Sequence, residues 1–199
     1  TVARGVGTVA AAGMTALTGA VTAIGDFGLA GNSFTAVSLP DGLQTLGRGA
    51  FDSCTGLTNT TLPAAITAVP GKCFADCTKL LTVDYKGEVT AIGERAFANC
   101  AQLEELTLPE SVTSIGAGAF EGLTGLKKLT VLCDASLLPE GSFADCPNLI
   151  DVRLSADAAD EQIAEWNAKL DRPWYDPILR AGESSGFVKM PFEPSPAED

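Results

Sequence analysis

The sequence contains no histidine among its 199 residues. This absence excludes the Ser-His-Asp and Cys-His arrangements of nucleophilic catalysis, a histidine general base and histidine-ligated zinc. Positive charge is also scarce, because 13 lysines and arginines stand against 25 aspartates and glutamates and give a formal net charge of −12. Nucleic acids and anionic membranes are bound by clustered positive charge, so both are poor partners for this chain.

The sequence also has no stretch typical of a membrane-spanning segment or a secretion signal. Residues 5–25 carry no charge, but nine of these 21 residues are Gly or Thr. A spanning helix is richer in Leu, Ile and Phe, and a secretion signal has a charged segment before a compact apolar one. We therefore expect no membrane insertion of this chain. Its composition, 46% apolar and 19% charged, is that of a folded domain.

A pattern with a period of 23 residues runs without gaps through five copies. Phenylalanine recurs at Phe51, Phe74, Phe97, Phe120 and Phe143. Three residues later come Cys54, Cys77, Cys100, Leu123 and Cys146, and three further on come Leu57, Leu80, Leu103, Leu126 and Leu149. Such self-similarity predicts a solenoid, in which parallel strands stack at roughly 4.8 Å per rung and equivalent side chains form continuous columns.

Each copy predicts a short strand, a corner and a compact turn. Apolar and polar residues alternate over 106–108, as in a half-buried strand, and Pro109 ends that strand because it has no N–H to donate. Residues 112–115 form a second short extended segment, and Gly116 relieves the corner after it. Apolar residues three apart over 96–103 predict a short helix or 3-10 turn with one buried face.

The repeat pattern divides the chain into a solenoid and a C-terminal remainder. We expect the solenoid over residues 1–154, with regular copies at about 35–149 and degenerate rungs at 5–34. Because the first residues fall inside a repeat, this end is either a degenerate cap or the start of a fragment of a longer protein. Residues 155–181 predict an amphipathic helix that caps the last rung. Residues 182–199, rich in acids and proline, predict a loose tail.

The repeats resemble the BspA-type leucine-rich repeats, also called the Treponema pallidum type. The likeness covers about residues 15–154 and is carried by Leu106-x-Leu108-Pro109, Val112-Thr113-x-Ile115-Gly116, Ala96-Phe97-x-x-Cys100 and their copies. The resemblance implies a curved, right-handed solenoid without an active site. It also implies a bacterial protein that is secreted or held at the cell surface, since several members are adhesins for host matrix proteins or other bacteria.

Three departures from this family pattern involve four residues. Leu123 replaces the cysteine, Pro139 replaces the glycine, and Tyr85 with Lys86 replaces Leu-Pro. With these local exceptions, the predicted fold is an α/β repeat. It is a right-handed leucine-rich-repeat solenoid with short parallel strands, short helical or 3-10 turns and a C-terminal helical cap.

The six cysteines permit three interpretations: buried thiols, a disulfide or a metal site. Four of them share one repeat position, which favours a buried column of small apolar side chains. Cys73 takes the place of alanine in other copies, so Cys73-x-x-x-Cys77 is not a special pair, and Cys133 at a corner is expected to be the most accessible thiol. A disulfide or a metal site remains an alternative.

The acidic residues do not assemble a catalytic or cation site. Glu104 and Glu105 are adjacent and therefore face opposite sides of a strand. Asp151, Asp157, Asp160 and Glu161 could attract calcium, but their spacing is not that of an EF-hand loop. We predict no catalytic residue, no cofactor and no metal.

The outward positions of the predicted strands form a polar, threonine-rich row, which we call the binding strip. Its residues are Asn59, Thr61, Thr82, Asp84, Glu105, Thr107, Lys128, Thr130, Asp151 and Arg153. The strip lacks the aromatic anchors of tight interfaces, so it suits weak or multivalent binding, and a plain solvated sheet face is the alternative.

The leading hypothesis is a non-enzymatic module, extracellular or at the cell surface, that binds a host or bacterial surface protein or a glycan. The alternative is a structural spacer, or a repeat segment of a larger surface protein whose activity lies outside this chain. We expect a monomer in either case.

Overall fold

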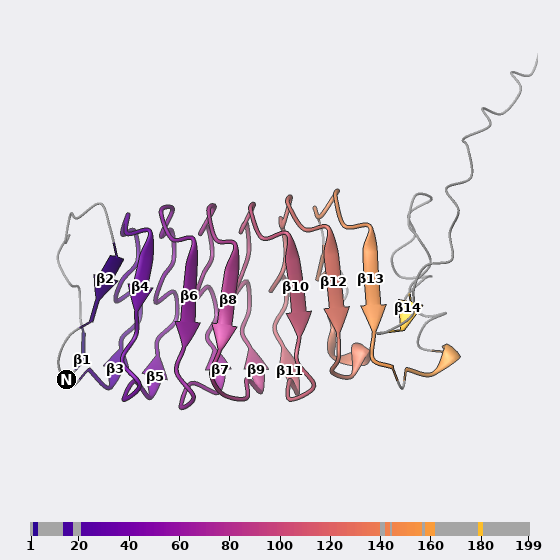
Figure 1. Ribbon diagram of the computed structural model, residues 1–199, viewed down its shortest axis with the longest axis horizontal. Coiled ribbons are helices and arrows are strands. Elements are labelled where there is room, and N and C mark those ends of the chain that lie inside the picture. The colour runs from indigo at the N-terminus through magenta and orange to yellow at the C-terminus, as the bar shows by residue number, and fades with distance from the viewer. Residues whose placement is uncertain are drawn as a thin grey trace, which may run out of the picture.

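Two rows of short parallel strands run along the molecule and define its long axis in the computed structural model (Figure 1). The structure describes residues 2–3, 14–17, 21–139, 142–143, 145–156, 158–161 and 179–180. The front row consists of β2 (Met14–Ala16), β4 (Ala36–Ser38), β6 (Asn59–Leu62), β8 (Thr82–Tyr85), β10 (Glu105–Leu108), β12 (Lys128–Val131), β13 (Asp151–Leu154) and β14 (Leu179–Arg180). The second row consists of β1 (Val2–Ala3), β3 (Ala23–Ile24), β5 (Thr45–Leu46), β7 (Ala68–Val69), β9 (Ala91–Ile92) and β11 (Ser114–Ile115).

All strand pairs are parallel, and the regular rungs pair residues one period apart. In the front row, Glu105 lies opposite Lys128, which lies opposite Asp151. In the second row, Ala68 lies opposite Ala91, which lies opposite Ser114. The 23-residue repeat therefore predicts the strand register correctly, and the fold is a parallel β-solenoid.

Among the residues that the structure describes, each row is interrupted once. The front strands form two sheets, β2-β4-β6-β8 and β10-β12-β13-β14, and the second row is divided between β5 and β7. The interruption between β5 and β7 has a chemical cause. The backbone N–H groups of Gly47 and Gly93 donate to the carbonyls of Ile24 and Val69 in the preceding rungs. The equivalent residue in the rung between them is Pro70, which has no N–H to donate.

The turns correct the sequence prediction, because no helix or 3-10 helix forms at the phenylalanine positions. N–H groups of alternate residues, such as Gly49 and Phe51, donate to Gly71 and Cys73 of the next rung. The residues between them make turn hydrogen bonds within their own rung. Left-handed φ angles recur every fourth residue and interrupt any helix, at Gly49, Ser53, Lys72, Asp76, Arg95, Asn99, Gly118 and Gly122. Among the described residues, helix is confined to η1 (Ala135–Leu137) and to Asp160 and Glu161, so the predicted α/β character is not found there.

The core is a column of stacked phenylalanines along the axis. Neighbouring ring centroids from Phe51 to Phe143 are 5.2, 5.5, 6.1 and 5.3 Å apart, and the planes differ by no more than 16°. Phe51, Phe74, Phe97 and Phe120 are at most 1% exposed. Each ring can bury both faces only against the rings of adjacent rungs, so the column couples every rung to the next.

The cysteine column donates hydrogen bonds between rungs. The thiols of Cys54, Cys77 and Cys100 donate to the carbonyls of Leu29, Phe51 and Phe74, each at 3.1 Å. All six cysteines are buried thiols, as the repeat pattern predicts. Cys133 is 6% exposed while the other five are fully buried, which confirms it as the most accessible thiol.

The corner glycines permit close approach between rungs. A Cβ atom on Gly93 would lie 2.3 Å from the backbone nitrogen of Gly71, and one on Gly116 would lie 2.3 Å from that of Glu94. Neither has a left-handed φ. The sequence predicts the position of the corner correctly, and the corner glycine is required because the backbones of neighbouring rungs approach closely there.

At the C-terminal end, β14 pairs with β13 and extends the front sheet. This strand provides hydrogen-bond partners for part of the β13 edge, which the predicted capping helix was expected to cover. Within the predicted cap region 155–181, residues 162–178 fall outside the described residues, as does the predicted tail at 182–199. In the parts of the chain that the structure describes, no helix is long and apolar enough to cross a membrane.

Truncating one ring of the column tests the stacking. Phe97→Ala is expected to lower the free energy of unfolding by about 3–5 kcal/mol, because Phe97 is 1% exposed and lies between two rings. Urea unfolding measures this change. The matched control is Phe27→Ala, since Phe27 is 48% exposed. A loss below about 1 kcal/mol for Phe97→Ala contradicts the column.

Removing the buried hydroxyl of Thr60 is expected to stabilise the protein. Thr60 is 3% exposed at an inward position that other front strands fill with Val37 or Leu129, and its Oγ1 has no hydrogen-bond partner among the described residues. Replacing it by valine removes the unsatisfied group at nearly constant volume. Thr60→Val is therefore expected to raise the free energy of unfolding by roughly 1 kcal/mol, as measured in urea. A lower stability would show that the hydroxyl is satisfied.

The buried thiols predict a loss of stability in alkali. Burial raises the pKa of Cys54 from its ordinary value of 9.0 to about 11, and it raises those of Cys77 and Cys100 in the same direction. The unfolded chain therefore releases these protons first, and the free energy of unfolding falls as pH rises above 9.0. Urea unfolding across this range should show a shallower fall for Cys54→Ala. Equal slopes would contradict the assignment.

Candidate binding face

The binding strip lies on the front strands, in the rows that the repeat predicts. Asn59 pairs in register with Thr82, and Thr61 with Asp84. Beyond β8, the strip continues in two rows on β10, β12 and β13, with Glu105, Lys128 and Asp151 in one and Thr107, Thr130 and Arg153 in the other. The strip residues of β6, β8 and β10 are exposed and those of β12 and β13 are half-buried, so all ten reach the surface.

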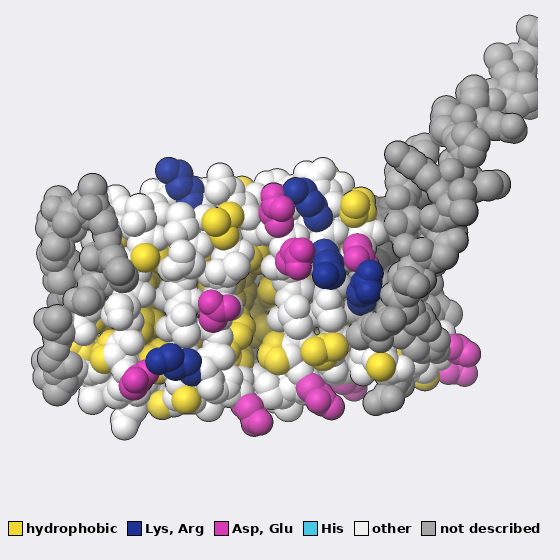
Figure 2. Space-filling model, in the orientation of Figure 1, with side chains coloured by type: hydrophobic (Ala, Val, Ile, Leu, Met, Phe, Trp, Pro, Cys, Tyr) yellow, Lys and Arg dark blue, Asp and Glu magenta, His cyan; other side chains and the backbone are white. Residues whose placement is uncertain are grey.

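Most charges on the strip are neutralised by neighbours. Lys128 lies 3.7 Å from Glu105, and the Arg153 Nε lies 3.1 Å from Asp151. Asp84, by contrast, has no ion pair within the described residues. The front surface in Figure 2 accordingly shows acidic and basic side chains gathered over the later front strands and a sparser distribution over the earlier ones.

The strip is divided where β8 fails to pair with β10. All residues from 81 to 109 are described, and no backbone hydrogen bond joins these two strands. The same two rungs remain joined in the second row, where Ser114 pairs with Ala91 and Ile115 with Ile92. The rings of Phe97 and Phe120 from these rungs have the largest centroid separation in the column, 6.1 Å. The two rungs therefore separate at the front while their second-row strands stay paired.

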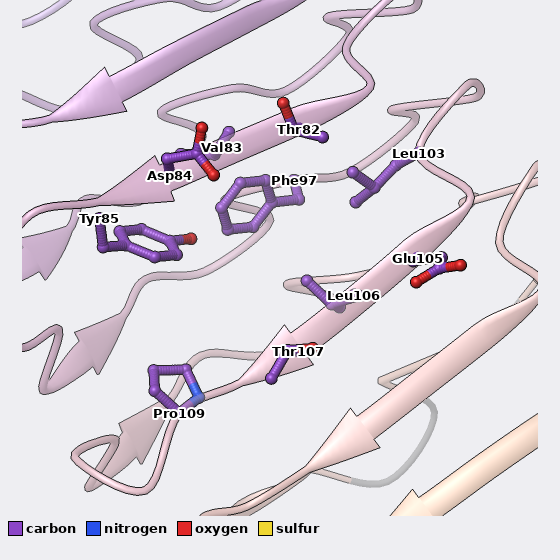
Figure 3. A pocket seen from close by; sticks show the side chains of 10 residues that line it. All are labelled: Thr82, Val83, Asp84, Tyr85, Phe97, Leu103, Glu105, Leu106, Thr107 and Pro109. Atoms are coloured by element: carbon purple, nitrogen blue, oxygen red, sulfur yellow. The ribbon is translucent and has the colours of Figure 1, made fainter.

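This separation creates a cleft of about 310 Å³. Its walls are β8 and β10, and Figure 3 shows their side chains around the opening. Thr82, Asp84, Glu105 and Thr107, four of the ten strip residues, line the cleft. The remaining lining residues are Val83, Tyr85, Phe97, Leu103, Leu106 and Pro109. The cleft thus combines an apolar floor with a polar rim that carries two carboxylates.

Tyr85 is the residue that distinguishes this rung. It occupies the place of Leu62, Leu108 and Leu154, and its ring extends from the end of β8 into the space between the strands (Figure 3). Burial raises the pKa of Tyr85 above its ordinary value of 10.0, with smaller contributions from Cys73 and Asp84. The hydroxyl therefore stays protonated at neutral pH and can donate a hydrogen bond.

The repeat pattern predicts the strip but not the cleft. It places Thr82, Asp84, Glu105 and Thr107 on a continuous face, and on that pattern the departure from Leu-Pro at Tyr85 and Lys86 is a local detail. The signal for the cleft was that departure, since the strand that ends in Tyr85 is the one that does not pair with the next front strand. What the sequence could not give is the direction in which the ring leaves the strand.

The described residues contain no group of three or more His, Cys, Asp or Glu side chains that could hold a metal ion. Glu104 pairs with Lys127 at 2.9 Å and Glu105 lies 3.7 Å from Lys128, so each of these neighbouring acids has its own basic partner. Asp151 pairs with Arg153, and the predicted partner Asp157 in the calcium alternative lies outside the described residues. The arrangement on this face can make hydrogen bonds, ion pairs and apolar contacts with a bound partner.

Comparison with known proteins agrees with this geometry. A family model described as the BspA type leucine rich repeat region matches residues 22–150 in six copies. A leucine-rich repeat protein of T. pallidum is similar in structure, with a TM-score of 0.62 and 23% identity over 80% of this chain and 80% of that protein. One from Bacteroides ovatus has a TM-score of 0.58 and 24% identity over 79% of this chain and 44% of that protein. No curated protein sequence matches significantly.

The structural likenesses, at these identities, establish a shared fold. The family match is independent of them and spans more than half of the chain. It includes the phenylalanine column, the cysteine column and the strands of both rows from β3 to β12. The chain therefore belongs to the BspA-type leucine-rich repeat family.

Proposed function

We propose that the chain is a non-enzymatic adhesion module that acts at a bacterial cell surface or after secretion. In this proposal the binding strip on the front strands contacts a protein, or a glycan, of a host or of another bacterium. Membership of a leucine-rich repeat family supports a protein-binding repeat module. The likeness to BspA-type repeats, several of which belong to adhesins, supports the surface role.

One observation carries the proposal most directly. The strip presents side chains from five successive strands of the front row, from Asn59 to Arg153, in two rows that are in register on β6 and β8 and again on β10, β12 and β13. Its threonines, amide and charges offer hydrogen-bond donors and acceptors at the spacing of the rungs. An extended surface of this kind suits a partner that makes many weak contacts, since aromatic anchors are absent from the strip.

The second candidate, a structural spacer, is favoured by the same lack of aromatic anchors. In that case the rungs hold apart other parts of a larger surface protein, and the strip is a solvated sheet face. The two candidates differ in whether changes on the strip alter any binding.

Two variants with identical chemistry separate these candidates. Thr130→Lys changes the strip on β12, at a residue that does not line the cleft. Thr124→Lys makes the same replacement at an exposed turn residue. Binding of the purified chain to immobilised matrix proteins and to a glycan array is then measured. The strip variant is expected to weaken binding at least about tenfold, and the turn variant to leave it within about twofold.

Two results would contradict the adhesion proposal. The first is no binding by the unaltered chain at micromolar concentration. The second is equal binding by both variants, which would favour the spacer. Thermal unfolding of each variant confirms that any loss arises at the surface.

A further inference from the structure

We propose that the cleft between β8 and β10 is a docking site for an extended peptide segment of a partner protein. The segment inserts as an added strand and places a lysine or arginine side chain beside Asp84 and Glu105. This inference rests on the proposed binding function, and it names the binding site and the chemistry of the partner.

The first wall of the cleft is an unpaired strand edge on β8. The N–H groups of Thr82 and Lys86 donate to Thr58 and Leu62 of the preceding rung. Backbone groups of successive residues in a strand point to opposite sides, so those of the intervening odd-numbered residues, Val83 and Tyr85, face the cleft. No residue of β10 pairs with them.

The second wall is the matching edge of β10. The carbonyls of Glu104 and Leu108 accept hydrogen bonds from Lys128 and Leu132 of the following rung. By the same alternation, the backbone groups of Glu105 and Thr107 face β8. Each wall thus offers free donors and acceptors, and a strand placed between them can pair on both sides.

The walls are held in place from behind. The second-row strands β9 and β11 of these rungs remain paired, and Phe97 and Phe120 remain stacked. The opening is therefore part of the folded solenoid, and a partner strand does not have to break existing hydrogen bonds to enter it. Binding to such a preformed site avoids much of the cost of reorganisation.

The side chains around the cleft define the pattern of the inserted segment. Val83, Phe97 and Leu106 form its apolar floor, and Thr82 and Thr107 contribute to its polar rim. An extended peptide directs successive side chains to opposite faces. It therefore fits with small apolar residues toward the floor and polar residues toward the rim.

The charge of the rim selects a cation. Asp84 has no ion pair within the described residues, and the Glu105 carboxylate lies 3.7 Å from the Lys128 ammonium, which is a long ion pair. Both carboxylates line the cleft. A lysine or arginine on the outward face of the inserted strand would neutralise them, whereas an acidic residue there would be repelled in a chain of net charge −12.

Tyr85 sets the width of the opening. Its ring stands where other rungs have leucine, and its hydroxyl makes no hydrogen bond within the described residues. The ring separates the strands, and the hydroxyl is available to a backbone carbonyl of the inserted segment. Replacing Tyr85 by leucine is expected to let β8 and β10 pair and close the cleft.

The test uses a blocked peptide, Thr-Val-Arg-Val-Thr, as the probe. Its binding to the full chain is measured by amide hydrogen exchange in NMR spectra. The amides of Val83, Tyr85, Glu105 and Thr107 are expected to exchange fast in the free chain and at least about tenfold more slowly with saturating peptide. Two control peptides carry Glu in place of Arg, or N-methyl groups on both valines, and each is expected to bind at least about tenfold more weakly.

Two variants of the chain complete the test. Tyr85→Leu should protect the same amides without peptide and lose peptide binding. Asp84→Lys with Glu105→Lys keeps the cleft open and should reverse the preference, so that the Glu peptide binds more tightly than the Arg peptide. Thermal unfolding verifies that both variants are folded.

Absence of protection at these four amides, equal binding of the Arg and N-methylated peptides, or unchanged binding by Tyr85→Leu would overturn the inference. Capture of a glycan in the cleft instead of the peptide would also overturn it. These results are distinct from failure of the proposed function, which is tested by Thr130→Lys on β12, at a residue that does not line the cleft. If that variant loses binding to matrix proteins or glycans while Tyr85→Leu has no effect, the adhesion proposal is supported and the peptide-docking inference is rejected.

Discussion

No rung of this protein can bury its apolar face alone, and stacking on adjacent rungs is the constraint on which the fold depends. The phenylalanine column shows this dependence on stacking most clearly, since each interior ring stacks on the rings of the preceding and the following rung. Cysteine suits the neighbouring column because it is small and its thiol donates to a carbonyl of the preceding rung. The same requirement explains Gly93 and Gly116, where a side chain would collide with the backbone of the rung beside it.

Departures from the repeat produce local features while the stack persists. Pro70 removes one donor and interrupts the second row between β5 and β7. Tyr85 coincides with the interruption of the front row between β8 and β10. At each interruption the other row continues to join the same rungs, so neither divides the solenoid. This redundancy lets a single rung acquire a cleft at moderate cost to the fold.

The periodic features were predictable from the sequence, and the aperiodic ones were not. The spacing of Phe51 to Phe143 predicts the column, and the alternation at Leu106 and Leu108 predicts the front strands and their register. The turns were mistaken for short helices because apolar residues three apart fit both structures. Only the left-handed φ angles at residues such as Gly49 and Ser53, and the hydrogen bonds to the next rung, distinguish them. The cleft depends on the path of one ring, which a repeat pattern does not encode.

Removal of one whole period tests the stacking account most directly. Deleting residues 98–120 joins Phe97 to Glu121 and preserves the 23-residue register on both sides. The account predicts a cooperatively unfolding protein with the same β-sheet circular dichroism per residue, whereas deletion of residues 98–108 should abolish the fold because every later column is then displaced. Cooperative folding of the second deletion, or unfolding of the first, would contradict the claim that equivalent side chains in successive rungs hold the molecule together.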